Sequence, residues 1–185
     1  MKNVEFKAEL RDVALAEAII RKLGGRFVMT MRQTDTYYRI VRGRLKKRET
    51  EILNPAGTPA DPPEVIFYER PDALKPKLSE FTIFTEEEAE ARFGQAPLPV
   101  WLVVTKVRRL FMLGPTRIHL DDVDGLGRFV EFESMVSSNN PEPEAMKHNI
   151  TLRTALQHVL GEPIAASYSD MLARELEHSA QPPEP

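Results

Sequence analysis

Charged and apolar residues alternate along at least five short segments of this chain, and within each segment the charges recur at every second position. Successive side chains of a β-strand point to opposite faces, so this pattern predicts strands with one ionic and one mostly apolar face. A surface sheet would explain one or two such strands, whereas five indicate a sheet that encloses a charged cavity. The segments are residues 4–10, 44–48, 105–108, 117–121 and 130–133.

Turn signals between these and similar segments predict eight or nine strands in all. A loop dense in Pro and Gly occupies residues 54–63, and a Gly-Pro pair at 114–115 predicts a hairpin. The strand spacing is uneven because a helix and two loops intervene, but the run is consistent with an antiparallel barrel. Besides the first segment, strands are expected at residues 27–31, 34–41, 44–51, 64–70, 77–84, 100–112, 116–123 and 128–136.

Helical patterns lie between and after these strands. An apolar stripe at helical spacing predicts a helix from Asp12, which can act as its N-cap, to about Leu23. A short acidic helix is expected at residues 86–93, and two further helices at residues 142–160 and 164–177. These helices can cover apolar sheet faces that would otherwise meet water.

The ionic faces carry more basic than acidic residues. Barrels of about eight strands normally fill their interior with apolar side chains, so here the apolar faces must point outward. Buried charges are costly unless each finds a partner or a ligand. Surplus cations favour a polyanion, and the carboxylates suit a hard divalent cation, so a polyphosphate with Mg²⁺ or Mn²⁺ fits both sets. The expected inward residues are basic Lys7, Arg44, Lys46, Arg48, Lys106, Arg108 and Arg117, and acidic Glu5, Glu9, Asp121, Glu131 and Glu133.

Several segments also resemble, in order, those of a known family. Residues 3–7 (NVEFK) are similar to an ExExK signature, and residues 167–172 (SYSDML) to the ending common among class IV adenylate cyclases. On these motifs the chain resembles the CYTH superfamily, the triphosphate tunnel metalloenzymes, in its class IV adenylate cyclase and thiamine triphosphatase-like branch. The other matching segments are residues 35–38, 45–49, 68–72, 77–79, 106–108, 120–123, 125–127 and 131–133.

This resemblance implies an α+β fold, a closed eight-stranded antiparallel β-barrel or tunnel with a charged lumen and helices packed outside. It also assigns site residues. The metal ligands for Mg²⁺ or Mn²⁺ would be Glu5, Asp121, Glu131 and Glu133. The substrate-binding residues would be Lys7, Lys46, Arg48, Arg70, Lys77, Lys106, Arg108 and Arg117.

Two features of the resemblance concern single residues. Asn3 stands where the signature has its first Glu, so the metal site loses one formal charge. Tyr37 resembles a tyrosine that meets the signature lysine in thiamine triphosphatases, which implies that Lys7 and Tyr37 form a catalytic pair that activates water. An aromatic wall of the tunnel is the other role open to Tyr37.

Composition sets looser bounds. The chain of 185 residues suits one domain, expected at residues 1–178, with a polar, disordered tail at residues 179–185. A net charge of −3 gives no reason to expect nucleic acid or a membrane as partner, and the lack of cysteine excludes thiol chemistry. The chain shows no signal peptide and no apolar run of the roughly 20 residues that a membrane helix needs. We therefore expect a cytoplasmic protein, and its oligomeric state stays open.

Three functions remain. The sequence contains neither a Walker phosphate loop nor an arrangement for a nucleophilic Ser or Cys, so direct attack on phosphorus is expected. A metal-dependent phosphohydrolase acting on tripolyphosphate, ATP or thiamine triphosphate is favoured. A class IV adenylate cyclase also requires the ribose 3′-oxygen in line with the α-phosphorus, and no base-recognition residue is evident in the sequence. The third possibility, suggested by Asn3, is a non-catalytic module that binds a polyphosphate or nucleotide.

Overall fold

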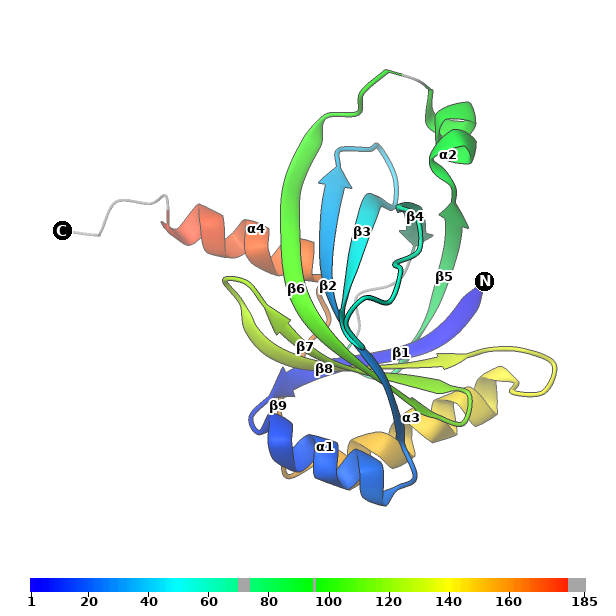
Figure 1. Ribbon diagram of the computed structural model, residues 1–185, viewed down its shortest axis with the longest axis vertical. Coiled ribbons are helices and arrows are strands. Elements are labelled where there is room, and N and C mark those ends of the chain that lie inside the picture. Colours follow the sequence, from blue (N-terminus) through cyan, green and yellow to red (C-terminus); the bar gives the residue numbers. More distant parts are fainter. Residues whose placement is uncertain (70–73, 95, 180–185) are drawn as a thin grey trace.

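The computed structural model describes residues 1–69, 74–94 and 96–179 (Figure 1). Within these residues, nine strands form one antiparallel sheet, and four helices accompany it. The strands are β1 (Lys2–Leu10), β2 (Arg26–Tyr38), β3 (Arg44–Asn54), β4 (Glu64–Glu69), β5 (Lys77–Phe84), β6 (Val100–Leu113), β7 (Thr116–Val123), β8 (Gly127–Met135) and β9 (Leu160–Pro163). The helices are α1 (Val13–Lys22), α2 (Glu86–Phe93), α3 (Glu142–Leu156) and α4 (Tyr168–Ser179).

Strand β1 closes the sheet into a barrel. The strand order is β5-β4-β3-β2-β6-β7-β8-β1-β9, and β1 also pairs with β5. The first half of β1 pairs with β5 on one side, and most of its length pairs with β8 on the other. Strand β9 continues beyond the closed ring by pairing with the end of β1. The predicted closed, eight-stranded antiparallel barrel is therefore confirmed.

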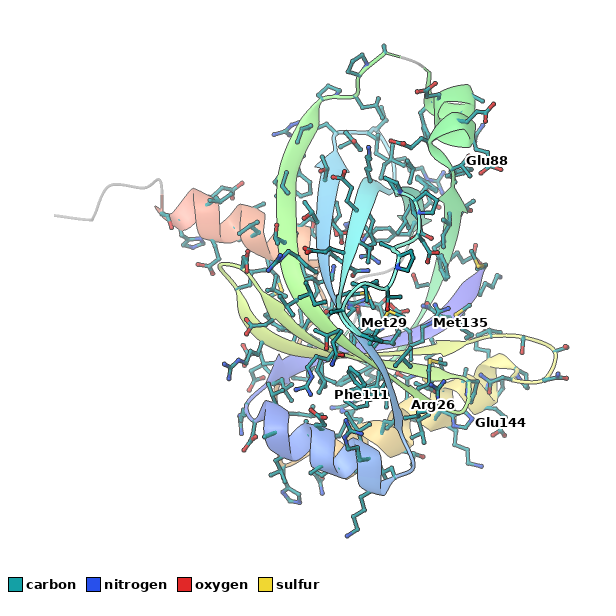
Figure 2. The ribbon with its side chains drawn as sticks, viewed as in Figure 1. Arg26, Met29, Glu88, Phe111, Met135 and Glu144 are labelled. Carbon is teal, nitrogen blue, oxygen red and sulfur yellow. The ribbon has the colours of Figure 1, made fainter. Side chains whose placement is uncertain are left out.

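The apolar faces of the strands point outward, toward the helices. Helices α1 and α3 lie along the outer face of β1, β7 and β8 (Figure 1). Phe6, Phe111 and Phe132 are buried there with Ile20 of α1 and Leu156 of α3. Figure 2 shows Phe111 between the sheet and these helices. A smaller cluster joins α2 to β3 and β4. The largest apolar cluster thus lies outside the barrel, while the lumen combines charged side chains with apolar ones such as Met31, Ile66 and Leu110.

Local signals fix the starts of two helices as predicted. Asp12 caps α1 by accepting a hydrogen bond from the Leu15 backbone N–H at 2.9 Å. Thr85 and Glu88 form a reciprocal capping box at the start of α2. None of the described helices has the length and apolarity needed to span a membrane.

The structure corrects three element boundaries. The strands expected at residues 27–31 and 34–41 form one strand, β2, because Gln33 faces the lumen while Arg32 pairs outside with Glu51. The helix expected at residues 142–160 ends at Leu156, because the chain then turns to pair β9 with β1. The last helix begins at Tyr168 rather than Ile164. The predicted tail falls mainly on residues 180–185, which lie outside the described residues.

Candidate functional site

The barrel lumen contains a cavity of about 590 Å³ to which all eight barrel strands contribute. Each strand supplies residues at every second position, as its ionic parity predicts. Ser167 and Tyr168, at the start of α4, also line the cavity. The charged residues that face it are Glu5, Lys7, Asp35, Lys46, Arg48, Asp61, Glu64, Lys106, Arg108, Arg117, Glu131 and Glu133.

A cationic cluster surrounds Asp35 of β2. Lys46 Nζ lies 2.8 Å from Asp35 Oδ2 and Lys106 Nζ lies 3.1 Å from the same oxygen. Arg48 donates two hydrogen bonds of 2.7 Å to the two carboxylate oxygens. The pairing of the strands brings these residues together. Asp35 on β2 lies directly opposite Arg48 on β3, and Lys106 lies on β6, which pairs with the other edge of β2. One carboxylate is thus shared by three cations.

Burial and mutual repulsion change how these groups titrate. Burial lowers the pKa of the Lys106 ammonium to about 7, although Asp35 opposes the shift. Burial likewise lowers the pKa of Lys46 to about 8, with Arg48 adding to the effect. Burial would raise the pKa of Asp35, but Arg48, Lys106 and Lys46 hold it well below its usual range. An added anion would therefore stabilise the protonated lysines.

A second cluster, on β7 and β8, has the opposite chemistry. His119, Glu131 and Glu133 bring one ligand atom each to within 4.8 Å of one another. His119 Nδ1 lies 3.5 Å from Glu131 Oε2 and 3.8 Å from Glu133 Oε1. Glu5 is the cross-strand partner of Glu133. Like charges opposite each other on a sheet are destabilising, so a cation at this position would relieve the repulsion.

The donors of this second cluster fit a divalent metal ion. Carboxylate oxygens suit Mg²⁺ and Mn²⁺, and an imidazole nitrogen favours a transition metal over Mg²⁺. Two further oxygens face the same cavity: in the described part of the chain, no hydrogen bond reaches the buried Asn3 Oδ1 or Gln33 Oε1. Buried polar atoms normally have partners, so these oxygens are candidates for ligand or solvent contacts.

Lys7 and Arg108 lie between the two clusters. Lys7 Nζ is 3.4 Å from Glu131 Oε1 and 4.1 Å from the centroid of the Tyr168 ring. Arg108 donates at 2.9 Å to Glu131 and binds Asp121 through two hydrogen bonds of 2.7 Å. Burial would raise the pKa of Glu131, but Lys7, His119 and Arg108 keep it well below its usual range. Glu131 is therefore ionised and tied to both sides of the lumen.

Lys7 and Tyr37, the expected catalytic pair, both line the cavity, and each lies beside another group as well. The aromatic ring against Lys7 is that of Tyr168, from α4. Tyr37 lies instead near Lys46, whose Nζ is 5.5 Å from the centroid of the Tyr37 ring. Tyr37 stays on the lumen wall, so its expected role as an aromatic wall agrees with its position.

Most predicted site residues meet in the lumen, and a few do not. Asp121 is absent from the cavity lining, because Arg108 and the Tyr168 hydroxyl, at 2.9 Å, bind its carboxylate. Lys77 is not among the residues that line the cavity, and it donates to the Ala165 carbonyl at 2.8 Å. Glu9 is exposed beside β9. Arg70 lies outside the described residues. The predicted lumen residues that do line the cavity are Glu5, Lys7, Lys46, Arg48, Lys106, Arg108, Arg117, Glu131 and Glu133.

Sequence reasoning assigned no functional role to Asp35, His119 or Tyr168. The sequence pattern did indicate Asp35, because it alternates with Gln33 and Tyr37 at every second position of one strand and so lies on the same face of the sheet. His119 also lies on the ionic parity of its strand, between Arg117 and Asp121. Tyr168 gave no such signal, since its position depends on how α4 packs against the barrel.

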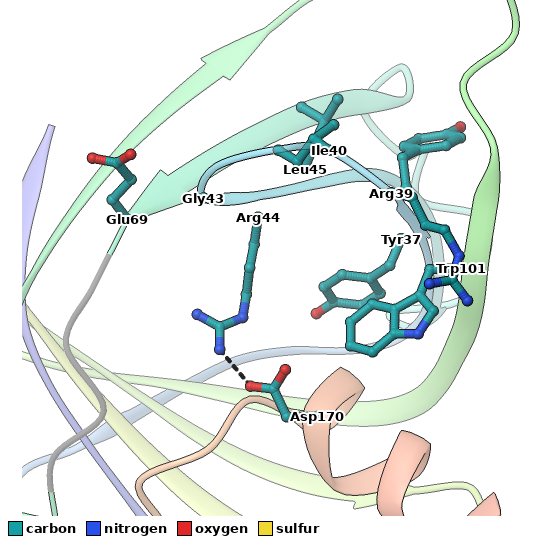
Figure 3. Close-up of a pocket in the computed structure, with 10 residues that line it drawn as sticks. Tyr37, Arg39, Ile40, Gly43, Arg44, Leu45, Glu69, Trp101 and Asp170 are labelled. Atoms are coloured by element: carbon teal, nitrogen blue, oxygen red, sulfur yellow. Dashed lines mark hydrogen bonds and ion pairs between the residues drawn. The ribbon is translucent and has the colours of Figure 1, made fainter. Parts of the chain in front are cut away.

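A second cavity, of about 580 Å³, adjoins the lumen (Figure 3). Tyr37 lines both cavities. Arg44, which was expected inside the tunnel, lines this second cavity and forms a 2.5 Å ion pair with Asp170 of α4. Figure 3 shows Trp101 beside Tyr37 and Arg39 on the same wall.

The fold agrees with comparisons to known proteins. A model of the CYTH domain matches residues 1–168. The chain belongs to the CYTH domain family. Among CYTH relatives, a Methanocaldococcus jannaschii protein named as a candidate adenylate cyclase is 22% identical over 175 residues, which cover 92% of this chain and 98% of that protein.

Two solved structures share the CYTH architecture of this chain. A Pyrococcus horikoshii protein has a TM-score of 0.68 and 22% identity, covering 91% of this chain and 98% of its own. A Hippeastrum protein, described as a candidate adenylyl cyclase with a dominant triphosphatase activity, has a TM-score of 0.58 and 14% identity and covers 98% of both chains. At these identities the likeness supports the fold alone.

Proposed function

We propose that this CYTH protein is a divalent-metal-dependent phosphohydrolase that cleaves a triphosphate bound in its tunnel. The observation that carries the proposal is the pairing of two clusters in one lumen. Lys46, Arg48 and Lys106 share the single carboxylate of Asp35. Glu131 and Glu133 instead lie on the same side of β8, with one ligand atom each within 4.8 Å of one another and of His119. A metal polyphosphate would add negative charge to the first cluster, and its metal ion would lie beside the two carboxylates of the second.

The cationic cluster would hold the phosphate chain. Arg48 offers a planar fork for phosphate oxygens, and Lys46 and Lys106 act as point charges. Arg108 and Lys7 extend this surface toward Glu131, so consecutive phosphates can contact consecutive cations along the lumen. Arg117 is exposed but lines the same cavity, so it would contact the phosphate chain at the solvent-exposed side of the lumen.

The metal ion, Mg²⁺ or Mn²⁺, would be held by Glu131, Glu133 and Glu5, with His119 as a nitrogen donor. When bound, such an ion supplies neutralisation of phosphate charge and a water of lowered pKa. Lys7 lies against Glu131 and so can orient the terminal phosphate relative to this cluster. Asp121 would act indirectly in this scheme, because it fixes Arg108 and Tyr168 in place.

The tyrosines of the lumen would act as hydrogen-bond donors rather than as bases. Burial raises the pKa of Tyr37 well above its usual value, and it raises that of Tyr168 in the same way. Neither phenol is therefore ionised near neutral pH. Tyr37 could position water or a phosphate oxygen, but proton removal from the attacking water would fall to another group.

A class IV adenylate cyclase activity is the second candidate. The name of the Methanocaldococcus jannaschii relative and the 167–172 ending support it. Both reactions use the same phosphate grip. They differ in whether water attacks the terminal phosphorus or the ribose 3′-oxygen attacks the α-phosphorus with release of pyrophosphate.

Product analysis separates these activities. The protein is incubated with tripolyphosphate, ATP or thiamine triphosphate and with Mg²⁺, Mn²⁺ or a chelator, and products are resolved by ion-exchange chromatography. Hydrolysis predicts orthophosphate from tripolyphosphate only when metal is present. Cyclic AMP with stoichiometric pyrophosphate from ATP would instead establish the cyclase. Tight binding of all three compounds without any product would leave a binding module.

A further inference from the structure

Tyr168 reaches the lumen from α4 and not from a strand. It is buried and lines the same cavity as the charged residues of the strands. Two reciprocal hydrogen bonds fix the start of this helix, because the Asp170 N–H donates to Ser167 Oγ at 3.1 Å and the Ser167 N–H donates to Asp170 Oδ2 at 3.2 Å. The Tyr168 ring also packs against Phe129 of β8, with 5.2 Å between the ring centroids. The phenol therefore occupies a defined place in the lumen.

Tyr168 and four charged residues form a closed network of contacts. The Tyr168 hydroxyl donates to Asp121 at 2.9 Å, and Asp121 accepts two hydrogen bonds of 2.7 Å from Arg108. Arg108 also donates to Glu131 at 2.9 Å, and Glu131 lies 3.4 Å from Lys7 Nζ. Lys7 closes the network, because its Nζ lies 4.1 Å from the centroid of the Tyr168 ring. All five residues are buried, so these contacts are little weakened by solvent.

Tyr168 is the uncharged member of this network and contributes two different parts of its side chain. The hydroxyl donates to a carboxylate, and the face of the aromatic ring carries the partial negative charge that attracts an ammonium group. The same residue thus holds Lys7 directly and holds Arg108 through Asp121. A phenylalanine would keep only the contact with Lys7, and a leucine would keep neither.

The two cations that Tyr168 holds lie beside the proposed metal cluster. Lys7 and Arg108 both contact Glu131, which belongs to that cluster. In the proposed function Glu131 would bind a metal ion, and sharing its oxygens with the ion would weaken its hold on the two cations. Of the contacts described above, those with the Tyr168 ring and with Asp121 would then remain. Tyr168 therefore lies where it can keep both cations aligned while metal and phosphate are bound.

We propose that Tyr168 is a positioning residue for hydrolysis, whose ring and hydroxyl hold Lys7 and Arg108 in the geometry in which they contact the terminal phosphate. The inference rests on the proposed function and adds to it a residue from outside the barrel strands. Small displacements of catalytic groups slow a reaction strongly, so such support acts on the rate. Binding of the phosphate chain would depend chiefly on the separate cluster around Asp35.

Two substitutions at Tyr168 separate its two contacts. Hydrolysis of tripolyphosphate is measured with Mn²⁺ or Mg²⁺ at saturating metal. Tyr168→Leu removes both contacts and should lower kcat by about 10²-fold, the cost of a misplaced catalytic group, with a much smaller change in KM. Tyr168→Phe keeps the aromatic ring and should lower kcat only severalfold. An unchanged kcat in Tyr168→Leu, or a change in KM alone, would overturn the proposal.

Leu172→Ala is the matched control on the same helix. Leu172 packs against the same apolar cluster as Tyr168 but takes no part in the closed network. Its truncation should lower the melting temperature, because apolar contact between α4 and the barrel is lost. At temperatures well below that transition, kcat should stay close to the wild-type value. A loss of kcat as large as that of Tyr168→Leu would show that docking of α4, and not Tyr168, governs the rate.

A double-mutant cycle with Lys7→Met tests whether Tyr168 acts through Lys7. Coupled residues give losses that do not multiply, whereas a merely structural defect would reduce the rate by the same factor in both backgrounds. In the Lys7→Met background we expect the effect of Tyr168→Leu to shrink to the severalfold loss that remains through Asp121 and Arg108. Equal factors in the two backgrounds would contradict the proposal.

Nuclear magnetic resonance of Lys7 tests its placement without turnover. Lysine ε-carbons are isotopically labelled, and the Lys7 signal is identified by its absence from Lys7→Met. Because Lys7 Nζ lies over the Tyr168 ring, the ring current should displace the signal of the neighbouring ε-protons. The displacement should persist in Tyr168→Phe and Leu172→Ala and should disappear in Tyr168→Leu. A Lys7 signal that Tyr168→Leu leaves unchanged would overturn the proposal.

These outcomes separate the positioning role from the proposed function. If the wild type cleaves no triphosphate, the hydrolase is wrong, and the Lys7 signal still decides whether Tyr168 holds Lys7. If the wild type is active and Tyr168→Leu has the wild-type kcat, the positioning role is wrong and the hydrolase stands.

Discussion

The two charged clusters of the lumen lie on the same kind of alternating strand, yet cations predominate in one and carboxylates in the other. On β2, β3 and β6 three cations share one carboxylate, and the pKa of Lys106 falls to about 7. On β7 and β8 two carboxylates face one imidazole. Both arrangements place buried or half-buried groups of like charge close together. A ligand that carries both signs, as proposed above, would relieve the repulsion in both clusters.

Asp35 is the residue on which the cationic cluster depends most. Asp35→Asn would leave Lys46, Arg48 and Lys106 buried without their shared anion. We expect a loss of about 3–5 kcal/mol in the free energy of unfolding, measured by urea denaturation without ligand. Tripolyphosphate should restore much of this loss and should raise the melting temperature more than it does in wild type. An Asp35→Asn variant as stable as wild type would show that the three cations do not depend on the Asp35 carboxylate to offset their mutual repulsion.

Glu133 tests the other cluster. Glu133→Gln keeps the shape of the side chain but removes a charge facing His119 and Glu5. Turnover should fall about 10²-fold or more, because a metal ion contributes several kcal/mol of transition-state stabilisation. Tripolyphosphate binding measured without metal should remain. If metal-free tripolyphosphate binding fell as much as turnover, the two clusters would not have the separate roles proposed for them.

Arg48 should govern affinity rather than chemistry. Arg48→Ala removes a two-pronged donor and should weaken tripolyphosphate binding about tenfold, as expected for a charge-assisted hydrogen bond. Arg32→Ala breaks the exposed Arg32–Glu51 pair between the same two strands and is the matched control. Calorimetry should show no change for the control. Similar losses of tripolyphosphate affinity in both variants would show that the effect comes from the change in net charge and not from a contact made by Arg48.

Because the lysines of the cationic cluster titrate, triphosphate affinity and the free energy of unfolding should depend on pH in opposite directions. The pKa of Lys106 is about 7 in the folded chain, below its ordinary value of 10.5, so the unfolded chain holds more protons between these values. Stability without ligand should therefore rise with pH above about 7. Triphosphate affinity should fall severalfold over the same range, with proton uptake seen by calorimetry in two buffers. Lys106→Met should flatten both trends, and unchanged trends would contradict the assignment.

The smallest expected effect concerns metal choice. His119→Gln replaces a nitrogen donor with an amide in the cluster of Glu131 and Glu133. Mn²⁺ affinity should fall severalfold while Mg²⁺ affinity changes little, since imidazole favours transition metals. Pulsed electron paramagnetic resonance of bound Mn²⁺ should show nitrogen coupling in wild type and not in the variant. Identical spectra would remove His119 from the metal ligands.

Alternation predicted much of the site, and long-range packing decided the rest. Residues such as Lys46, Arg48 and Lys106 were expected in the lumen because strand parity is a local property. Asp121 shares that parity, yet Arg108 and Tyr168 hold it outside the cavity. The partner of Lys7 was expected on β2 and is found on α4. No local pattern specifies such contacts.

The sequence alone indicated strands around a charged cavity and the faces on which the charges lie, because side-chain direction in a strand follows from position along the chain. Closure of the barrel was implied by the resemblance to a known family. Tertiary structure decided which charges meet. Asp35 and Lys106 are 71 residues apart, Tyr168 and Asp121 are 47 apart, and Arg44 and Asp170 are 126 apart. These contacts depend on strand register and on where α4 packs, which are set by the whole core rather than by any one segment. For that reason the second cavity beside Trp101 becomes visible only in the folded chain.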